Sequence, residues 1–297
     1  MFLPTLKQLR YLTALDEHRH FGRAAEACFV SQSTLSAGIQ ELESLLNASL
    51  VERSNRSVVF TALGREIAAK AKVVLKEAQE LAEAAAAAKE PLSGALRLGV
   101  IPTIAPFLLP SVLPTLRKAY PKLKLFLTED LTDRLVDRLH DGTLDCLLLA
   151  LPAELGEAQE MPLFDDAFEL VCRKDHPLGK KAKLKLADLT DAPLLLLTDG
   201  HCLRDHALAA CRLPQRATGT DVAATSLHTL VEMTANGLGI TLLPEMALKA
   251  KILKGGELIA RPFDEAKPSR KIGLAWRKTS AREKEFRLLG QAIKTAY

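Results

Sequence analysis

Leucines in the first 60 residues are spaced as on the buried faces of short helices. A first helix is indicated by leucines at every third position, Leu6, Leu9, Leu12 and Leu15. A short second helix is expected over 21–28, and Ser31 is a favourable N-cap for a third. One face of this third helix carries Leu35, Ile39, Leu42 and Leu46. Two β-prone pieces, 50–51 and 58–60, flank a polar turn and predict a small hairpin.

Thr61 can cap a long helix that should run to about Lys89, because Pro91 stops it. Its apolar positions follow steps of four and three residues: Ile67, Ala71, Val74, Ala78, Leu81, Ala85 and Ala88. A seam of three heptads is typical of a helix that pairs with another helix. The alternative is an amphipathic helix that packs only against its own domain.

After Gly94 the pattern changes to strands that alternate with helices. Strands are predicted at Ala95–Val100, Leu123–Leu127, Cys146–Ala150, Phe168–Cys172, Leu194–Leu197, Ile240–Leu243, Leu258–Ala260 and Ile272–Trp276. Helices are predicted at about Pro106–Ala119, Thr132–His140, Leu203–Cys211, Ser226–Asn236 and Ala281–Ala296. Alternating β and α segments favour mainly parallel sheets, and about 200 residues suit two small α/β lobes better than one sheet.

Composition narrows the class of protein. The chain has 297 residues, of which 48% are hydrophobic and 26% charged, which suits about two globular domains and excludes a wholly disordered chain. The net charge of +4 is small, and residues 1–90 carry none of it, so a DNA-binding function must rest on a motif. The longest apolar run has eight residues, against about 20 for a membrane span. Five cysteines, an odd number, favour a cytoplasmic protein with reduced thiols.

Residues 21–36 have the order of a helix-turn-helix, in which a short helix and a tight turn precede a helix that enters the major groove of DNA. The side chains that would reach base edges are Gln32, Ser33, Thr34 and Ser36. The third helix has no Lys or Arg, so phosphate contacts are expected from Arg53 and Arg56 in the hairpin and from Arg23. The alternative is a three-helix packing module that binds no DNA.

Residues 6–65, with the run from Phe21 to Ser36 and the segments 51–53 and 61–64, resemble the winged-helix head of LysR-type transcriptional regulators. The resemblance implies an α/β protein with an N-terminal all-α winged helix-turn-helix, a long linker helix that dimerises the heads, and a two-lobed regulatory part like periplasmic binding proteins. The expected boundaries are 1–61 for the head, 62–91 for the linker and 92–297 for the regulatory part. Lobe I is expected at about 92–166 and 268–297, and lobe II at about 167–267. Ser33 departs from many family members, which carry proline there.

The five cysteines do not have the same surroundings. Three lie in apolar patterns and are predicted to be small buried hydrophobes: Cys28, Cys146 and Cys172. Cys202 follows a turn and should lie at the start of a helix, beside His201 and Arg204. A helix N-terminus and cationic neighbours stabilise a thiolate, so the pKa of this thiol is expected to fall below its usual value of about 8.5. This predicts a nucleophilic thiol, and the alternative is a buried, inert one.

The segment from Gly200 to Asp205, with Cys211 nine positions after Cys202, resembles the redox switch of the peroxide-sensing members of the LysR-type family. Segments elsewhere extend the similarity over the whole chain: 101–103, 106–110, 144–146, 224–227 and 239–244. The resemblance implies that Cys202 reacts with hydrogen peroxide and that Cys211 then forms a disulfide with it. The positions that match the peroxide pocket are Thr103, Thr132, His201, Asp205 and Arg270. By the same resemblance the chain would bind a double-stranded DNA operator as a dimer or tetramer, act with RNA polymerase and control antioxidant genes.

A disulfide between these two cysteines would require a change of shape. Residues 203–211 are rich in Ala and Leu and should be helical when both thiols are reduced. On a helix, Cys202 and Cys211 would be roughly 13 Å apart along the axis, whereas a disulfide needs Cα atoms within about 4.4–6.8 Å. The segment must therefore unwind or refold before the bond forms.

Two other functions are consistent with parts of this pattern. A LysR-type regulator could answer a small organic effector in the cleft between the lobes, although such a cleft does not need Cys202 and Cys211. A thiol peroxidase would use the same cysteines, but it needs no helix-turn-helix and no pairing helix. No metal or cofactor is expected, because the sequence has no Cys-x-x-Cys pair and no glycine-rich phosphate loop. The chain is therefore predicted to be a cytoplasmic regulator and not an enzyme.

Overall fold

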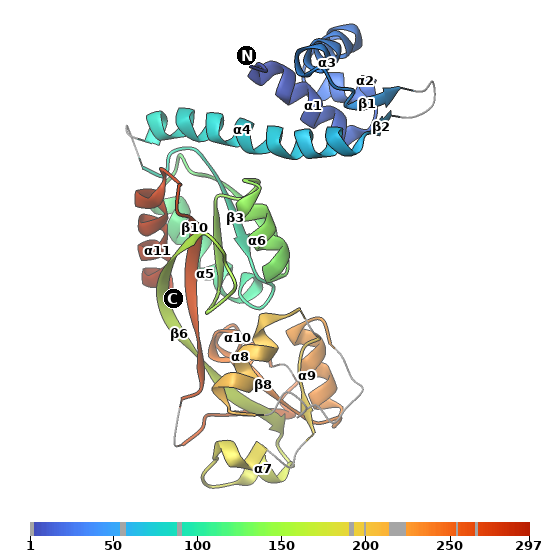
Figure 1. The fold of residues 1–297 in the computed structure, drawn as a ribbon. Coiled ribbons are helices and arrows are strands. Elements are labelled where there is room, and N and C mark those ends of the chain that lie inside the picture. The colour runs from blue at the N-terminus through green and yellow to red at the C-terminus, as the bar shows by residue number, and fades with distance from the viewer. Residues whose placement is uncertain are drawn as a thin grey trace. The chain divides into compact units, whose positions relative to one another are not determined.

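The computed structural model describes residues 3–53, 58–87, 91–189, 193–198, 200–213, 224–253, 255–264 and 267–297. Figure 1 shows the order of the helices and strands along the chain. The chain forms two compact units, Met1–Lys89 with Asp141–Thr143, and Glu90–His140 with Leu144–Tyr297. Within the described residues, no helix is both long enough and apolar enough to cross a lipid bilayer.

The first unit begins with three short helices and a two-stranded hairpin. These elements are α1 (Leu6–His18), α2 (Phe21–Ala27), α3 (Gln32–Leu46), β1 (Val51–Arg53) and β2 (Val58–Phe60). Their core contains the apolar residues of the predicted helix faces, among them Leu12, Leu15, Leu35, Ile39 and Leu42, all fully buried. Ser31 is the N-cap of α3, and its hydroxyl accepts a hydrogen bond from the backbone N–H of Thr34 at 3.2 Å. β1 and β2 pair antiparallel. The predicted order of elements in the head is confirmed.

Helix α4 (Ala62–Ala87) is the long helix that the sequence predicts, and Thr61 caps it through its hydroxyl. Helix α1 packs along α4, and Ala71 of the predicted pairing seam is buried within the chain itself. The first part of the seam is therefore occupied by the chain's own head, as in the alternative interpretation. Further along the helix, Val74 and Leu81 are 47% and 76% exposed.

The second unit is built on strands joined in the order β4-β3-β5-β10-β6-β8-β7, with β9 paired to β6. They are β3 (Ala95–Val100), β4 (Lys124–Glu129), β5 (Cys146–Leu151), β6 (Ala158–Arg173), β7 (Leu194–Leu195), β8 (Ile240–Pro244), β9 (Leu258–Arg261) and β10 (Ser269–Arg277). β3 is parallel to β4 and β5, and β7 to β8, but β6 and β10 are antiparallel to each other and to their other neighbours. The sheet is therefore mixed, which corrects the expectation of mainly parallel sheets. The reason is that two long strands, β6 and β10, pair with each other in opposite directions.

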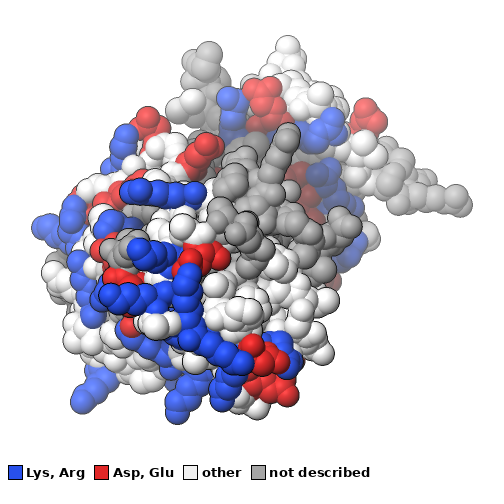
Figure 2. Space-filling model, turned by 90° about the horizontal axis from the view of Figure 1, so that it is seen from below, with Lys and Arg blue, Asp and Glu red and all other residues white. Residues whose placement is uncertain are grey.

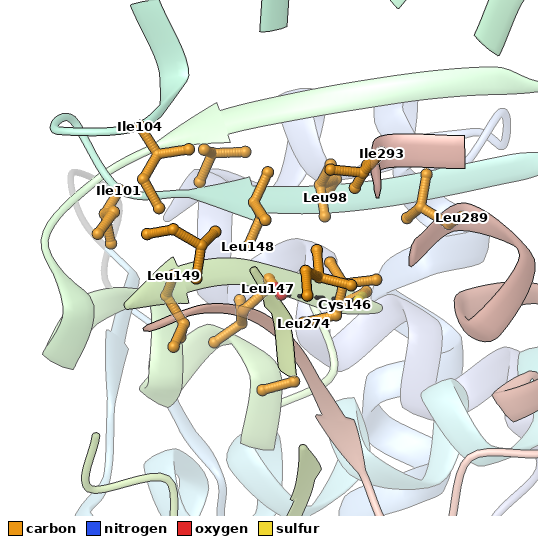
Figure 3. Packing of buried hydrophobic residues seen from close by; sticks show 14 of the residues in the cluster. Leu98, Ile101, Ile104, Cys146, Leu147, Leu148, Leu149, Leu274, Leu289 and Ile293 are labelled. Atoms are coloured by element: carbon orange, nitrogen blue, oxygen red, sulfur yellow. Dashed lines mark hydrogen bonds between the residues drawn. The ribbon is translucent and has the colours of Figure 1, made fainter. Parts of the chain in front are cut away.

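A first hydrophobic cluster surrounds β3, β5 and β10 and includes α5 (Ala105–Ala119), α6 (Thr132–His140) and α11 (Glu283–Ala296). Figure 3 shows its centre, where leucines of the strands meet Leu289 and Ile293 of α11. Cys146 lies in this core with no exposed surface, as predicted for a small buried hydrophobe.

A second hydrophobic cluster is formed by buried residues between Phe168 and Phe263. The remaining helices belong to this part of the chain: α7 (Pro177–Lys180), the 3-10 helix η1 (Leu186–Leu189), α8 (Cys202–Ala210), α9 (Leu227–Ala235) and α10 (Glu245–Lys249). The sequence does not predict α7, η1 and α10, and it predicts only the last part of β6. The first part of β6 escapes detection because polar residues such as Gln159, Glu160 and Asp165 interrupt its apolar positions.

Candidate functional site

A small cavity lies at the start of α8, where Cys202 is the first residue of the helix. Three segments far apart in the sequence line it: Ile101, Pro102, Thr103, Leu131, Thr132, Gly200, His201 and Cys202. Its volume of about 10 Å³ is close to the least that one water molecule needs. Gly200 has a φ of +90°, a conformation that glycine adopts without strain, and it turns the chain into α8. The fold therefore brings a partly buried thiol, two hydroxyls and an imidazole around one small space.

Arg270 does not line the cavity, but it forms a buried network with one of the lining residues. Its guanidinium and the Asp166 carboxylate are both 0% exposed and form an ion pair at 3.0 Å. Arg270 Nη1 donates to Thr103 Oγ1 at 2.8 Å, and Nη2 donates to the Thr103 carbonyl at 3.0 Å. The second oxygen of Asp166 accepts from the backbone N–H of Met246 at 2.9 Å. Asp166 thus orients the Arg270 guanidinium, which in turn holds Thr103, a residue of the cavity lining.

Two other polar groups of the lining have hydrogen-bonding capacity to spare. Thr132 Oγ1 is buried and makes no hydrogen bond of standard geometry among the described residues, but it lies close enough to the Cys202 thiol to lower its pKa. His201 is the N-cap of α8, but its side chain makes no capping hydrogen bond, and burial lowers the pKa of its imidazole. A neutral imidazole and a hydroxyl can both hydrogen-bond to a small polar molecule.

Burial raises the pKa of the Cys202 thiol, which differs from the lowered pKa expected from the sequence. The Thr132 hydroxyl and the Arg270 guanidinium lower this pKa, but burial is the largest effect. The expectation counted His201 as a cationic neighbour, whereas burial favours its neutral form. In this conformation the thiol is therefore mostly protonated at neutral pH.

Cys211 lies at the opposite end of the same helix, where it is the C-cap of α8. It is buried in the second cluster, and burial raises its pKa to about 12. All five cysteines are free thiols. Since α8 is intact between Cys202 and Cys211, the two are roughly 13 Å apart along the helix, too far for a disulfide.

Four of the five predicted pocket residues gather at this site. Thr103, Thr132 and His201 line the cavity, and Arg270 reaches it through Thr103. Asp205 differs, because it is exposed in the first turn of α8 and outside the cavity lining. In this conformation it does not line the cavity, but its charge raises the pKa of the Cys202 thiol.

Asp166 is a site residue that sequence reasoning missed. It lies opposite Arg270 in the β6–β10 pairing, so its role depends on the register of two strands 104 positions apart. A pair of adjacent carboxylates, Asp165 and Asp166, before an apolar strand was the only local signal. Among the described residues, no group of three or more His, Cys, Asp or Glu side chains could hold a metal ion.

On the head, the start of α3 carries the side chains predicted to contact bases. Gln32, Ser33 and Thr34 are exposed, and Ser36 is partly exposed. Ser31 Oγ lies 2.9 Å from Ser33 Oγ and 2.8 Å from Thr34 Oγ1, so both hydroxyls share in the helix cap. Gln32 has the exposed side-chain amide of this group, and an amide is a group that can pair with adenine.

Of the three arginines predicted to contact phosphates, the structure describes the side chain of one. Arg23 is exposed on α2. The backbone of Arg53 ends β1, but its side chain and the whole of Arg56 lie outside the described residues. Phe29, in the turn between α2 and α3, is 91% exposed with a φ of +58°, a feature that sequence reasoning did not single out.

Both parts of the chain match models of known protein families. Residues 6–65 match the bacterial regulatory helix-turn-helix protein of the lysR family, and residues 89–297 match the LysR substrate binding domain. The chain is 43% identical over 293 residues to the HTH-type transcriptional regulator EstR of Acinetobacter baylyi, covering 98% of this chain and 97% of the relative. It is 43% identical over 297 residues to a probable hydrogen peroxide-inducible genes activator of Streptomyces viridosporus, covering 99% and 94%.

The fold agrees with a solved structure of the same family. A full-length OxyR variant from Pseudomonas aeruginosa matches with a TM-score of 0.80 at 38% identity, covering 99% of this chain and 96% of that one. The helix-turn-helix head, the long helix and the mixed α/β part therefore occur together in a known regulator. The chain belongs to the LysR family of DNA-binding transcriptional regulators.

Proposed function

We propose that this chain is a hydrogen-peroxide sensor that controls transcription. Peroxide oxidises Cys202 to a sulfenic acid, a disulfide with Cys211 follows, and the refolded regulatory part changes DNA binding. The observation that carries the proposal is a thiol in a cavity of water-like size, lined by Thr103, Thr132 and His201, with a second thiol on the same helix. Similarity to a probable peroxide-inducible activator and to OxyR supports it.

The first step consumes peroxide at Cys202. Its thiolate attacks one peroxide oxygen, an S–O bond forms, the O–O bond breaks, and the departing hydroxide takes up a proton to become water. The Thr132 hydroxyl, which lies beside the Cys202 thiol, and the Thr103 hydroxyl held by Arg270 can bind the peroxide oxygens. A cavity of about 10 Å³ must widen slightly for a molecule with two oxygens, and it excludes an organic effector of ordinary size.

The second step joins the two cysteines. The Cys211 thiolate attacks the sulfur of the sulfenic acid, an S–S bond forms, the S–O bond breaks, and hydroxide leaves and is protonated to water. The two thiols thereby supply the two electrons that reduce peroxide to two waters. Because α8 separates the two sulfurs, the helix must open, and Leu203, Ala207 and Leu208 then leave the second cluster.

A change in the regulatory part must alter how the DNA-binding heads of the assembled chains contact DNA. We assign α3, with Gln32 and its neighbours, to the major groove of a double-stranded operator. The exposed apolar residues Val74 and Leu81 of α4 favour pairing of two chains. A tetramer, as a dimer of such dimers, is the proposed larger assembly. RNA polymerase is the proposed protein partner, antioxidant genes are the proposed targets, and the cytoplasm is the proposed location because its thiols are kept reduced.

Peptide mass spectrometry after brief treatment with one equivalent of peroxide tests the proposal. We expect a Cys202–Cys211 bond in the wild-type chain, a sulfenic acid that persists in Cys211→Ser, and no reaction at this site in Cys202→Ser. Cys172→Ser, which alters a thiol fully buried elsewhere in the second cluster, is the matched control and should behave as the wild type. Oxidation of Cys211 at the wild-type rate in Cys202→Ser would contradict the proposed roles.

A further inference from the structure

His206 occupies a position on α8 that neither the cavity nor the disulfide uses. It follows Cys202 by four residues, so both side chains lie on one face of the helix. Its Nε2 lies 3.0 Å from the carbonyl oxygen of Pro152, the residue that follows β5. A carbonyl oxygen can only accept a hydrogen bond, so Nε2 carries the proton and donates it. The contact therefore ties α8 to the strand end of the first cluster.

The other ring nitrogen of His206 has no such contact. Nδ1 is buried and has no hydrogen-bond partner among the described residues. Burial lowers the pKa of His206, the nearby Arg270 acts in the same direction, and the Pro152 carbonyl and the Asp205 carboxylate oppose them. The ring is thus neutral at pH 7, with its single proton on the nitrogen that faces Pro152.

The two faces of α8 contact different parts of the regulatory unit. Cys202 packs against the first cluster, whereas Leu203 and Ala207 are buried in the second. The bond from His206 to Pro152 lies on the Cys202 side of the helix. This hydrogen bond forms only while the helix holds His206 beside the end of β5. Opening of α8 must therefore break it.

We propose that His206 is a positioning residue for the redox switch: its hydrogen bond to the Pro152 carbonyl latches α8 closed and resists the opening that brings Cys211 to Cys202. The inference rests on the proposed function, since the latch acts on the step that closes the disulfide. His206 does not line the cavity, so the first step with peroxide does not depend on it.

Removing this hydrogen bond should raise the equilibrium constant for opening of α8 about fivefold, which corresponds to about 1 kcal/mol for one hydrogen bond. His206→Ala should then close the disulfide about fivefold faster after the sulfenic acid forms. The disulfide becomes more stable relative to the dithiol by the same factor, and its reduction potential should fall by about 20 mV. If His206→Ala acted only through local helix propensity, disulfide closure would be slower than in the wild type, because Ala favours a helix more than His does.

The matched variant is His206→Gln, whose amide N–H can donate to the same carbonyl. It should restore the closure rate and the reduction potential of the wild type.

The pH dependence of disulfide closure is a second readout. Protonation adds a buried, unpaired N–H beside Arg270, and the lowered pKa means that the open segment binds this proton more readily. Closure in the wild type should therefore accelerate relative to His206→Gln as the pH falls below about 6.5.

The experiment follows sulfenic acid and disulfide by quenched mass spectrometry in the full-length chain, with hydrogen exchange over 203–213 in the reduced protein. Faster closure and faster exchange in His206→Ala, both reversed in His206→Gln, support the latch. Wild-type closure in His206→Ala, or equal effects of the two substitutions, would overturn it. If the wild type forms no disulfide, the proposed function fails, and hydrogen exchange in the reduced variants still decides whether the latch exists.

Discussion

The buried pair of Arg270 and Asp166 allows a sharp test of how the site is held together. Both side chains are 0% exposed, and Arg270 also bonds twice to Thr103. Arg270→Met fills a similar volume but removes the charge and every one of these hydrogen bonds. Asp166 then keeps only the backbone N–H of Met246 as a described partner.

Breaking one side of a buried ion pair costs about 3–5 kcal/mol, because the remaining charge is left without compensation. Burial already raises the pKa of Asp166, and loss of Arg270 removes the largest opposing effect. The folded variant therefore holds a proton on Asp166 that the unfolded chain releases above about pH 3.9. Its stability falls as the pH rises from that value to the raised pKa, so the loss should be larger at pH 7 than at pH 5.

The neighbouring pair of Lys271 and Asp165 is a matched control. It joins the same two strands one position along and has a 2.7 Å contact, but its side chains are 48% and 63% exposed. Lys271→Met should cost at most about 1 kcal/mol and show no comparable dependence on pH. The double variant Arg270→Met with Asp166→Leu should recover much of the loss, since no buried charge remains.

Urea unfolding at fixed protein concentration measures these differences. The chain has one tryptophan, Trp276, which is fully buried in the first cluster, so its fluorescence reports on the regulatory unit. A loss below about 1 kcal/mol for Arg270→Met, or an equal loss at pH 5 and pH 7, would refute the argument.

Three further outcomes are expected. Because burial raises the pKa of Cys202, its reaction with peroxide in the variant lacking the resolving cysteine should accelerate almost tenfold per pH unit between pH 6 and 8; a flat profile would contradict the raised pKa. Gly64→Ala places a Cβ 2.0 Å from the Leu50 carbonyl oxygen, so thermal unfolding should show the head destabilised by about 3 kcal/mol or more. Gln32→Ala should relax base preference, whereas Arg23→Ala should weaken binding to all sequences and flatten the salt dependence; equal losses on operator and random DNA for Gln32→Ala would argue against the groove assignment.

Much of the local structure could be predicted from the sequence because its signals are local. The leucine spacing and the Ser31 cap define α3, and Thr132–His140 is a helix with the predicted bounds. Side-chain periodicity encodes which face of one element is buried, and it needs no knowledge of the partner. The same reasoning placed Cys202 at a helix N-terminus, where the structure has it.

The tertiary structure decided what periodicity does not encode. The antiparallel pairing of β6 with β10 made the sheet mixed and set Arg270 against Asp166, 104 residues away. Folding also buried Cys202, which raises a pKa that helix position and neighbouring residue types predicted to fall. Burial and strand register depend on contacts between distant segments, and desolvation outweighs the local charges once those contacts exclude water. The sequence therefore determined which chemical groups are present, whereas the long-range packing determined which of them meet and in which charge state.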